Sequence, residues 1–216
     1  MKSRLLIYFK RSALLFIAFS TVVAILFFIF IAPHRTLPIL MYHSISAVEE
    51  KNNLSLPKNI FDKQMQYLSK NNYKIISLSE AANLIKQGSS IPNNLLVLNF
   101  DDGYRDFYGR AYTILKKYQF KATVFVIIDS LGEKNNLSWE QAQDLAKDDL
   151  IDIGAHSLSH RILPLLSREE ARKEIFLSKL ILETRLNKTI ESFCYPYGVL
   201  DDSIKELVKE AGFDPL

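Results

Sequence analysis

The sequence predicts an α/β fold in which helices connect the strands of a parallel sheet, closed as a barrel or left as an open sheet. Strand-like apolar runs alternate with helical patterns at least five times between residues 37 and 216. One run, LLVLNF at 95–100, is apolar apart from Asn99, as expected of a strand buried on both faces. In such folds, functional sites form where the carboxyl ends of the strands meet.

The individual elements follow from apolar runs and from helix start and stop signals. We predict strands at 37–42, 73–78, 95–100, 122–128, 150–155 and 192–198, the last running into a turn. We predict helices at 60–70, 79–87, 106–118, 139–147, 167–186 and 201–211, and an irregular segment at 44–58. Ser79 is the expected cap of the second helix. Capping boxes are expected at Ser138 with Gln141 and at Ser167 with Glu170.

The composition excludes several classes of protein. With 216 residues, the chain is long enough for one globular domain. A hydrophobic fraction of 48% excludes a disordered chain, and a single cysteine excludes an intramolecular disulfide framework. The net charge of +3 comes from four basic residues near the N-terminus, so the remainder has no basic excess. We therefore expect no nucleic-acid partner.

The N-terminus has the pattern of a membrane anchor. A basic tail at 1–12 precedes 20 residues without a charge at 13–32, and at about 1.5 Å per residue such a helix spans about 30 Å, the thickness of a bilayer core. The basic residues place the tail in the cytoplasm and, after a linker at 33–36, the domain at 37–216 outside. The alternatives are a cleaved signal peptide and a buried core helix.

Polar residues follow four of the predicted strands. They are His43, Asp101-Asp102-Gly103, the pair His156 and His160, and Pro196-Tyr197-Gly198. Each has a structural alternative, because Asp-Gly and Pro-Tyr-Gly are also turn sequences and a histidine can simply be half-buried. The two histidines of the pair are four residues apart, so on one helical turn they would share a face.

Together these residues have the chemistry of a metal-dependent hydrolase. Asp102, His156 and His160 supply the nitrogen and oxygen ligands that a divalent ion such as Zn²⁺ takes, with Co, Ni and Fe as other candidates. Asp101 then remains as a general base.

The motifs NFDDG at 99–103, HSLSH at 156–160 and YPYG at 195–198 resemble those of the polysaccharide deacetylases, the NodB-homology carbohydrate esterases. LMYHSI at 40–45 is similar to the opening of the permuted subgroup that de-N-acetylates poly-β-1,6-N-acetylglucosamine in biofilm matrices. The resemblance covers residues 37–216.

The resemblance implies a fold and a set of roles. The fold is a distorted (β/α) barrel of about seven strands. Asp101 is the implied catalytic base and His43 the catalytic acid. Asp102, His156 and His160 are the implied metal ligands. The backbone N–H of Tyr197 is the implied oxyanion donor. Cys194 stands where many members of the family have an arginine.

The resemblance also implies a substrate. We expect a membrane-anchored, extracytoplasmic hydrolase that removes acetyl groups from a polysaccharide containing N-acetylglucosamine, with poly-β-1,6-N-acetylglucosamine favoured. Peptidoglycan, chitooligosaccharide or an O-acetyl ester are alternative substrates. Family members continue past the point where AGFDPL ends this sequence, so we expect an incomplete C-terminus: either the gene is truncated or the barrel is left with an open seam. An inactive glycan-binding remnant is therefore a further alternative. The oligomeric state stays open.

Overall fold

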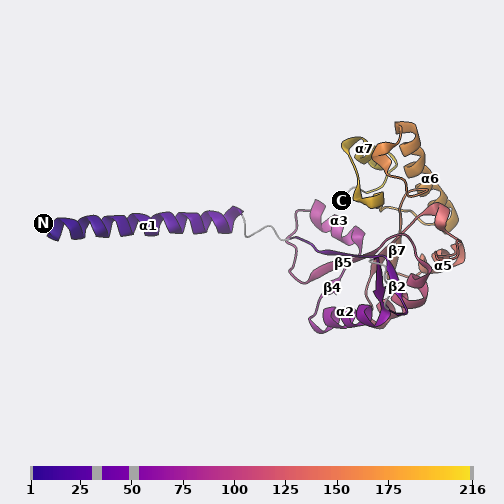
Figure 1. The fold of residues 1–216 in the computed structure, drawn as a ribbon, viewed down its shortest axis with the longest axis horizontal. Helices are drawn as coiled ribbons and strands as arrows, with labels where there is room; N and C mark the ends of the chain where they lie inside the picture. The colour runs from indigo at the N-terminus through magenta and orange to yellow at the C-terminus, as the bar shows by residue number, and fades with distance from the viewer. Residues whose placement is uncertain (1, 31–35, 49–53, 215–216) are drawn as a thin grey trace. The chain divides into compact units, whose positions relative to one another are not determined.

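The computed structural model describes residues 2–30, 36–48 and 54–214. The chain divides into two compact units, Met1–Thr36 and Leu37–Leu216, and each is considered by itself (Figure 1).

The first unit is the helix α1 (Lys2–Phe30). Where its side chains are described, at 12–27, the large apolar ones are exposed, including Leu14 and Phe16. No helix in the described part of the chain is long and apolar enough to cross a bilayer. Residues 28–32 of the predicted anchor lie outside the described side chains, so the anchor stays a prediction.

The second unit is built on a parallel sheet, as predicted. Its strands are β1 (Ile39–Tyr42), β4 (Lys74–Ile75), β5 (Leu95–Phe100), β6 (Ala122–Val126) and β7 (Ile151–Ala155). The order is β1-β5-β6-β7, and β4 pairs with the first residues of β5. Among the described strands this is an open five-stranded sheet, and closure into a barrel of about seven strands is not observed.

Two predicted segments differ from the structure. The segment at 44–58 is not wholly irregular, because β2 (Ser44–Ser46) pairs in parallel with β3 (Ser55–Pro57). The predicted strand at 192–198 is reduced to one bridge between Ala155 and Phe193, followed by a 3₁₀ turn at Pro196–Gly198.

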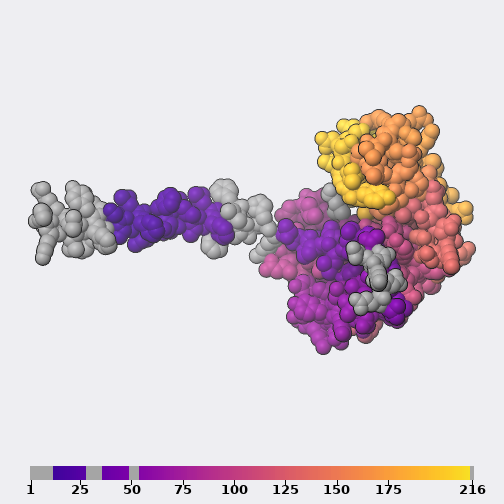
Figure 2. Space-filling model, in the orientation of Figure 1, coloured from indigo at the N-terminus to yellow at the C-terminus, as the bar shows by residue number. Residues whose placement is uncertain are grey.

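Helices connect the strands. They are α2 (Lys58–Lys70), α3 (Leu78–Lys86), α4 (Tyr112–Tyr118), α5 (Trp139–Leu145), α6 (Arg168–Leu186) and α7 (Asp202–Glu210). Short turns of other helical types lie at Phe107–Ala111, Ile128–Ser130 and Leu163–Leu165. In Figure 2, α6 and α7 lie together in orange and yellow, and Arg172 of α6 pairs with Glu210 of α7 at 2.8 Å.

The capping boxes explain where three helices begin. The boxes predicted at Ser138 and Ser167 are confirmed. The prediction of Ser79 as a cap is wrong, because Ser77 holds that place: its Oγ accepts the Glu80 N–H, and its own N–H donates to the Glu80 carboxylate at 2.7 Å. The cap therefore lies two residues earlier than predicted, and β4 is correspondingly short.

Alternate residues of the strands form two different faces. The outer face is apolar and packs against the helices; it includes Leu96, Leu98 and Phe100 of β5, Val124 and Val126 of β6, and Ile151 and Ile153 of β7. The inner face consists of the intervening residues, Val97 and Asn99 of β5 and Thr123 and Phe125 of β6. There, Leu78 and Ala81 of α3 pack against Val97 and Phe125. Asp101 continues the inner-face alternation, so the candidate site lies at the end of this face.

Candidate active site

The predicted site residues follow parallel strands and meet at one edge of the sheet. Tyr42 is paired with Phe100, and the Asp101 N–H donates to the Tyr42 carbonyl at 2.9 Å. His43 therefore lies beside Asp101. On the other side, β7 pairs with β6 and delivers His156, whose N–H donates to the Val126 carbonyl at 2.9 Å.

Asp102, His156 and His160 point toward one another. The Asp102 Oδ1 atom lies 3.5 Å from His156 Nε2 and 3.6 Å from His160 Nε2, and the two imidazole nitrogens are 3.1 Å apart. Ligands about 2.0–2.1 Å from a tetrahedral Zn²⁺ are separated by about 3.3 Å, so the three donor atoms have the spacing such an ion requires.

The hydrogen bond of His156 Nδ1 leaves the other ring nitrogen, Nε2, free to bind a metal. Its Nδ1 lies 2.8 Å from the Cys194 carbonyl oxygen, which can only accept, so Nδ1 carries the hydrogen and Nε2 presents its lone pair to the site. Burial lowers the pKa of His156 to about 4 and also lowers that of His160. Both imidazoles are therefore neutral near pH 7, the form that binds a metal.

A second group of donors shares His156. It contains Asp101 and Cys194, and its ligand atoms also lie within 4.8 Å of one another. Burial raises the pKa of the Cys194 thiol far above its usual range, and Asp101 raises it further, which disfavours the thiolate that binds metals. The set of Asp102, His156 and His160 is therefore the better fit.

His156 and His160 do not lie on one helical turn. The segment between them is a non-helical loop in which Ser157 and His160 have left-handed backbone angles, with φ of 63° and 61°. The His160 N–H donates to Ser157 Oγ at 2.9 Å. The two imidazoles meet because the loop turns back on itself.

The Asp101–Gly103 turn is held from the neighbouring loop. The Asn136 side-chain amide donates to the Asp102 carbonyl at 2.9 Å, and the Leu137 N–H donates to the Gly103 carbonyl at 2.9 Å. Gly103 has φ of +64°, and a Cβ atom there would lie 2.9 Å from Val126 Cγ1. Both facts require glycine at this position.

Asp101 has the properties of a general base. It is buried, its Oδ2 accepts the Cys194 thiol at 3.6 Å, and its Oδ1 has no hydrogen-bond partner among the described residues. Burial raises its pKa to about 6, against the opposing influence of His43. A base of this strength is well suited to proton transfer near neutral pH.

The Pro196–Gly198 turn brings Tyr197 to the site. Tyr197 has a left-handed backbone, with φ of 59°, and its ring centroid lies 4.6 Å from that of His160. Tyr197 is 65% exposed, so an aromatic side chain borders the donor set of Asp102, His156 and His160.

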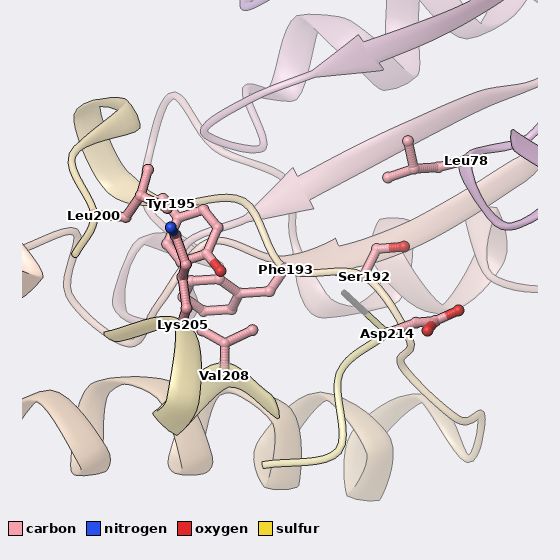
Figure 3. A pocket seen from close by; sticks show the side chains of 8 residues that line it. All are labelled: Leu78, Ser192, Phe193, Tyr195, Leu200, Lys205, Val208 and Asp214. Carbon is pink, nitrogen blue, oxygen red and sulfur yellow. The ribbon is translucent and has the colours of Figure 1, made fainter. Parts of the chain in front are cut away.

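The segment before this turn alternates between two environments. The Cys194 thiol points to Asp101, whereas Phe193 and Tyr195 line a separate pocket of about 190 Å³ with Lys205 and Val208 of α7 (Figure 3). Alternate residues of the segment therefore contact the Asp101 carboxylate and this pocket.

Three contributors to the site were not predicted from the sequence. They are the Cys194 carbonyl, the Asn136 amide and Glu174 of α6, which contacts the loop between the histidines. Backbone acceptors and loop amides have no sequence signal. Glu174 had one, because it lies at helical spacing between the buried Ala171 and Ser178.

Comparison with known proteins agrees with this geometry. Residues 89–216 match the sequence profile of the family described as polysaccharide deacetylase. YxkH of Bacillus subtilis, assigned to the polysaccharide deacetylases by its name, is 34% identical over 82% of this chain. A poly-β-1,6-N-acetyl-D-glucosamine N-deacetylase of Staphylococcus aureus is 29% identical over 77% of it. In both cases the aligned part spans 62% of the relative's own length.

Solved structures show the same fold. The deacetylase PplD of Streptococcus pyogenes, in complex with acetate, superposes with a TM-score of 0.77 at 29% identity, covering 82% of this chain and 81% of PplD. IcaB of Ammonifex degensii gives a TM-score of 0.75 at 24% identity, with the same coverage. From the matched profile and the similarity to YxkH, the chain belongs to the polysaccharide deacetylase family.

Proposed function

We propose that the protein is a metal-dependent polysaccharide N-deacetylase, with poly-β-1,6-N-acetylglucosamine as the favoured substrate. The observation that carries the proposal is the buried Asp101 carboxylate, with one unpartnered oxygen, directly beside the donor set of Asp102, His156 and His160. The similarity to the N-deacetylase of Staphylococcus aureus supports the choice of substrate.

The donor set would hold one divalent ion. When bound, such an ion supplies Lewis acidity and a water molecule of lowered pKa. The neutral imidazoles and the single carboxylate of Asp102 provide a site with borderline character, which suits Zn²⁺.

Three groups of the chain then take separate roles in the hydrolysis. Asp101 takes a proton from the attacking water at its free oxygen as the carbon–oxygen bond forms. The Tyr197 N–H donates a hydrogen bond to the developing oxyanion, an interaction typically worth about 3–4 kcal/mol. His43, on the opposite side of Asp101 from the ligands, donates a proton to the nitrogen as the carbon–nitrogen bond breaks. Acetate and a free amine on the sugar are the products.

Acetate release from a panel of glycans tests the proposal. We expect release from poly-β-1,6-N-acetylglucosamine oligomers that stops after chelation and resumes when Zn²⁺ is restored. Acetate release only from peptidoglycan, chitooligosaccharide or an O-acetyl ester would show that this compound is the substrate, while the reaction would still be deacetylation. A chain that binds Zn²⁺ but hydrolyses none of these compounds would instead be a glycan-binding protein.

We further propose that residues 13–32 anchor the protein, with the domain at 37–216 outside the cytoplasm. The support is the 20-residue uncharged run with all nearby basic residues on its N-terminal side. Protease added to spheroplasts should digest the domain. Protection until the inner membrane is lysed would contradict this topology.

A further inference from the structure

We propose that Glu174 is a positioning residue for the metal site. Its carboxylate fixes the histidine loop, defined here as His156–His160, so that both imidazoles face Asp102. The inference rests on the metal site of the proposed function, and it assigns a role to a residue on α6 that carries none of the recognised motifs.

The contacts of Glu174 are concentrated on the histidine loop. Its side chain is buried, with the residue only 5% exposed. Oε2 accepts the Ser159 N–H at 2.8 Å and Oε1 accepts the Ser159 hydroxyl at 2.5 Å. The Glu174 backbone carbonyl also accepts the Leu158 N–H at 3.1 Å. One residue of the helix therefore holds two consecutive residues of the loop.

The loop requires such support because its backbone is unfavourable. Ser157 and His160 are two non-glycine residues in the left-handed region, a strained conformation that such residues rarely adopt. Such a backbone persists only when surrounding contacts determine it. The Glu174 side chain holds Ser159, which lies between the two strained positions, so losing this side chain would let the loop relax and the imidazoles separate.

The charge of Glu174 has no basic partner of its own. Among the described residues, no lysine or arginine forms an ion pair with it, and a buried carboxylate without a cation is costly. The hydrogen bonds from the Ser159 N–H and hydroxyl are therefore the contacts that compensate the burial of its carboxylate.

Three variants of the full-length chain separate geometry from charge. Glu174→Ala removes both side-chain hydrogen bonds, and Ser159→Ala removes only the one to its hydroxyl. Glu174→Gln removes the charge and keeps the geometry, because an amide oxygen can accept the Ser159 N–H while its NH₂ donates to the Ser159 hydroxyl. Glu183→Ala is the matched control: this carboxylate of α6 accepts the Ile190 N–H at 3.0 Å, far from the histidines.

The measurement is the dissociation constant for Zn²⁺, by competition with a chromophoric chelator. We expect Glu174→Ala to weaken binding about 10–100-fold, the usual effect of removing a residue that orients metal ligands. Ser159→Ala should weaken it less, and Glu174→Gln should recover most of the affinity. Glu183→Ala should lower the melting temperature and leave Zn²⁺ affinity unchanged.

Other outcomes overturn the inference. Wild-type affinity in a folded Glu174→Ala protein would do so, as would Glu174→Gln binding as weakly as Glu174→Ala. If Glu174→Ala does not fold, wild-type affinity in Ser159→Ala together with weak binding in Glu174→Gln would exclude a positioning role. A wild-type chain that binds no Zn²⁺ would refute the metal site itself, whereas normal wild-type binding with unaffected variants refutes only the role of Glu174.

Discussion

The two faces of the central sheet are made from alternate residues of the same strands, yet they differ in the buried polar groups that they contain. The described outer face is apolar and sealed by helices. The inner face and its continuation hold three buried oxygens without hydrogen-bond partners among the described residues, on Asn99, Thr123 and Asp101. Unpaired buried groups reduce stability. The difference indicates that the outer face stabilises the fold, whereas the inner face leaves polar groups without partners, as expected of a face that serves the proposed function.

The largest effect should come from the inner face, on activity. Asp101→Asn keeps the side-chain shape and cannot act as a base, so we expect turnover to fall about 10²–10⁴-fold with metal content unchanged. Acetate release and elemental analysis check this result. Wild-type turnover in the variant would show that Asp101 is not the catalytic base. The inner face would then have no demonstrated role in activity.

On the outer face, the largest effect should be on stability. Phe100 packs against Phe107, Tyr42 and Phe61, with ring centroids 4.8, 5.2 and 5.7 Å away. Phe100→Ala should lower the free energy of unfolding by about 3–5 kcal/mol. Denaturant titration measures this change. Tyr67→Ala, at an aromatic residue that is 60% exposed, is the control and should change stability by less than about 0.5 kcal/mol.

The buried charge of Asp101 should destabilise the metal-free protein. Its pKa is raised from 3.8 to about 6 in the folded state, so folding favours the protonated form and stability falls as pH rises through that interval. At about 1.4 kcal/mol per pKa unit, the cost above pH 6 is about 2–3 kcal/mol. Asp101→Asn should therefore be the more stable protein at pH 7.

Unfolding of the metal-free proteins at several pH values tests this sign. The difference between the variant and the wild type should shrink as pH falls and disappear below about pH 4. A difference that grew on acidification would mean that the carboxylate is stabilised in the fold, contrary to its burial.

The smallest effects should come from a matched pair on β6. Thr123→Val replaces an unpartnered inner-face hydroxyl by a methyl group and should be neutral or stabilising by up to about 1 kcal/mol. Val124→Thr places a hydroxyl on the apolar outer face and should cost about 1–3 kcal/mol. Equal changes in stability for the two substitutions, measured by thermal unfolding, would show that the two faces do not differ in how they accommodate a hydroxyl group.

The sequence was sufficient to predict the alternation of strands and helices and the residues at the sheet edge. These depend on local patterns: apolar runs, capping boxes at Ser138 and Ser167, and polar residues that follow strands. Because parallel strands end at one edge, a linear pattern was enough to bring Asp102 and His156 together.

Other features depend on contacts between distant segments. A spacing of four residues suggested a helical turn for His156 and His160, but Glu174, from the next helix, holds the segment as a loop. Ser77 and Ser79 both fit an N-cap, and the choice between them depends on Glu80, which lies three residues after Ser77. The predicted strand before the Pro196–Gly198 turn is reduced to a bridge because, among the described residues, its pairing is confined to Ala155 of β7.

The pairing of β1 with β5 has a consequence for the order of assembly during folding. Strands β5, β6 and β7 follow one another with single crossovers, whereas Tyr42 must find Phe100 across nearly sixty residues. Contacts of short sequence separation form early, because less chain entropy is lost in closing the loop. We therefore expect Asp102, His156 and His160 to come together before β1 docks, so that His43, the proposed catalytic acid, is the last of these residues to reach the site.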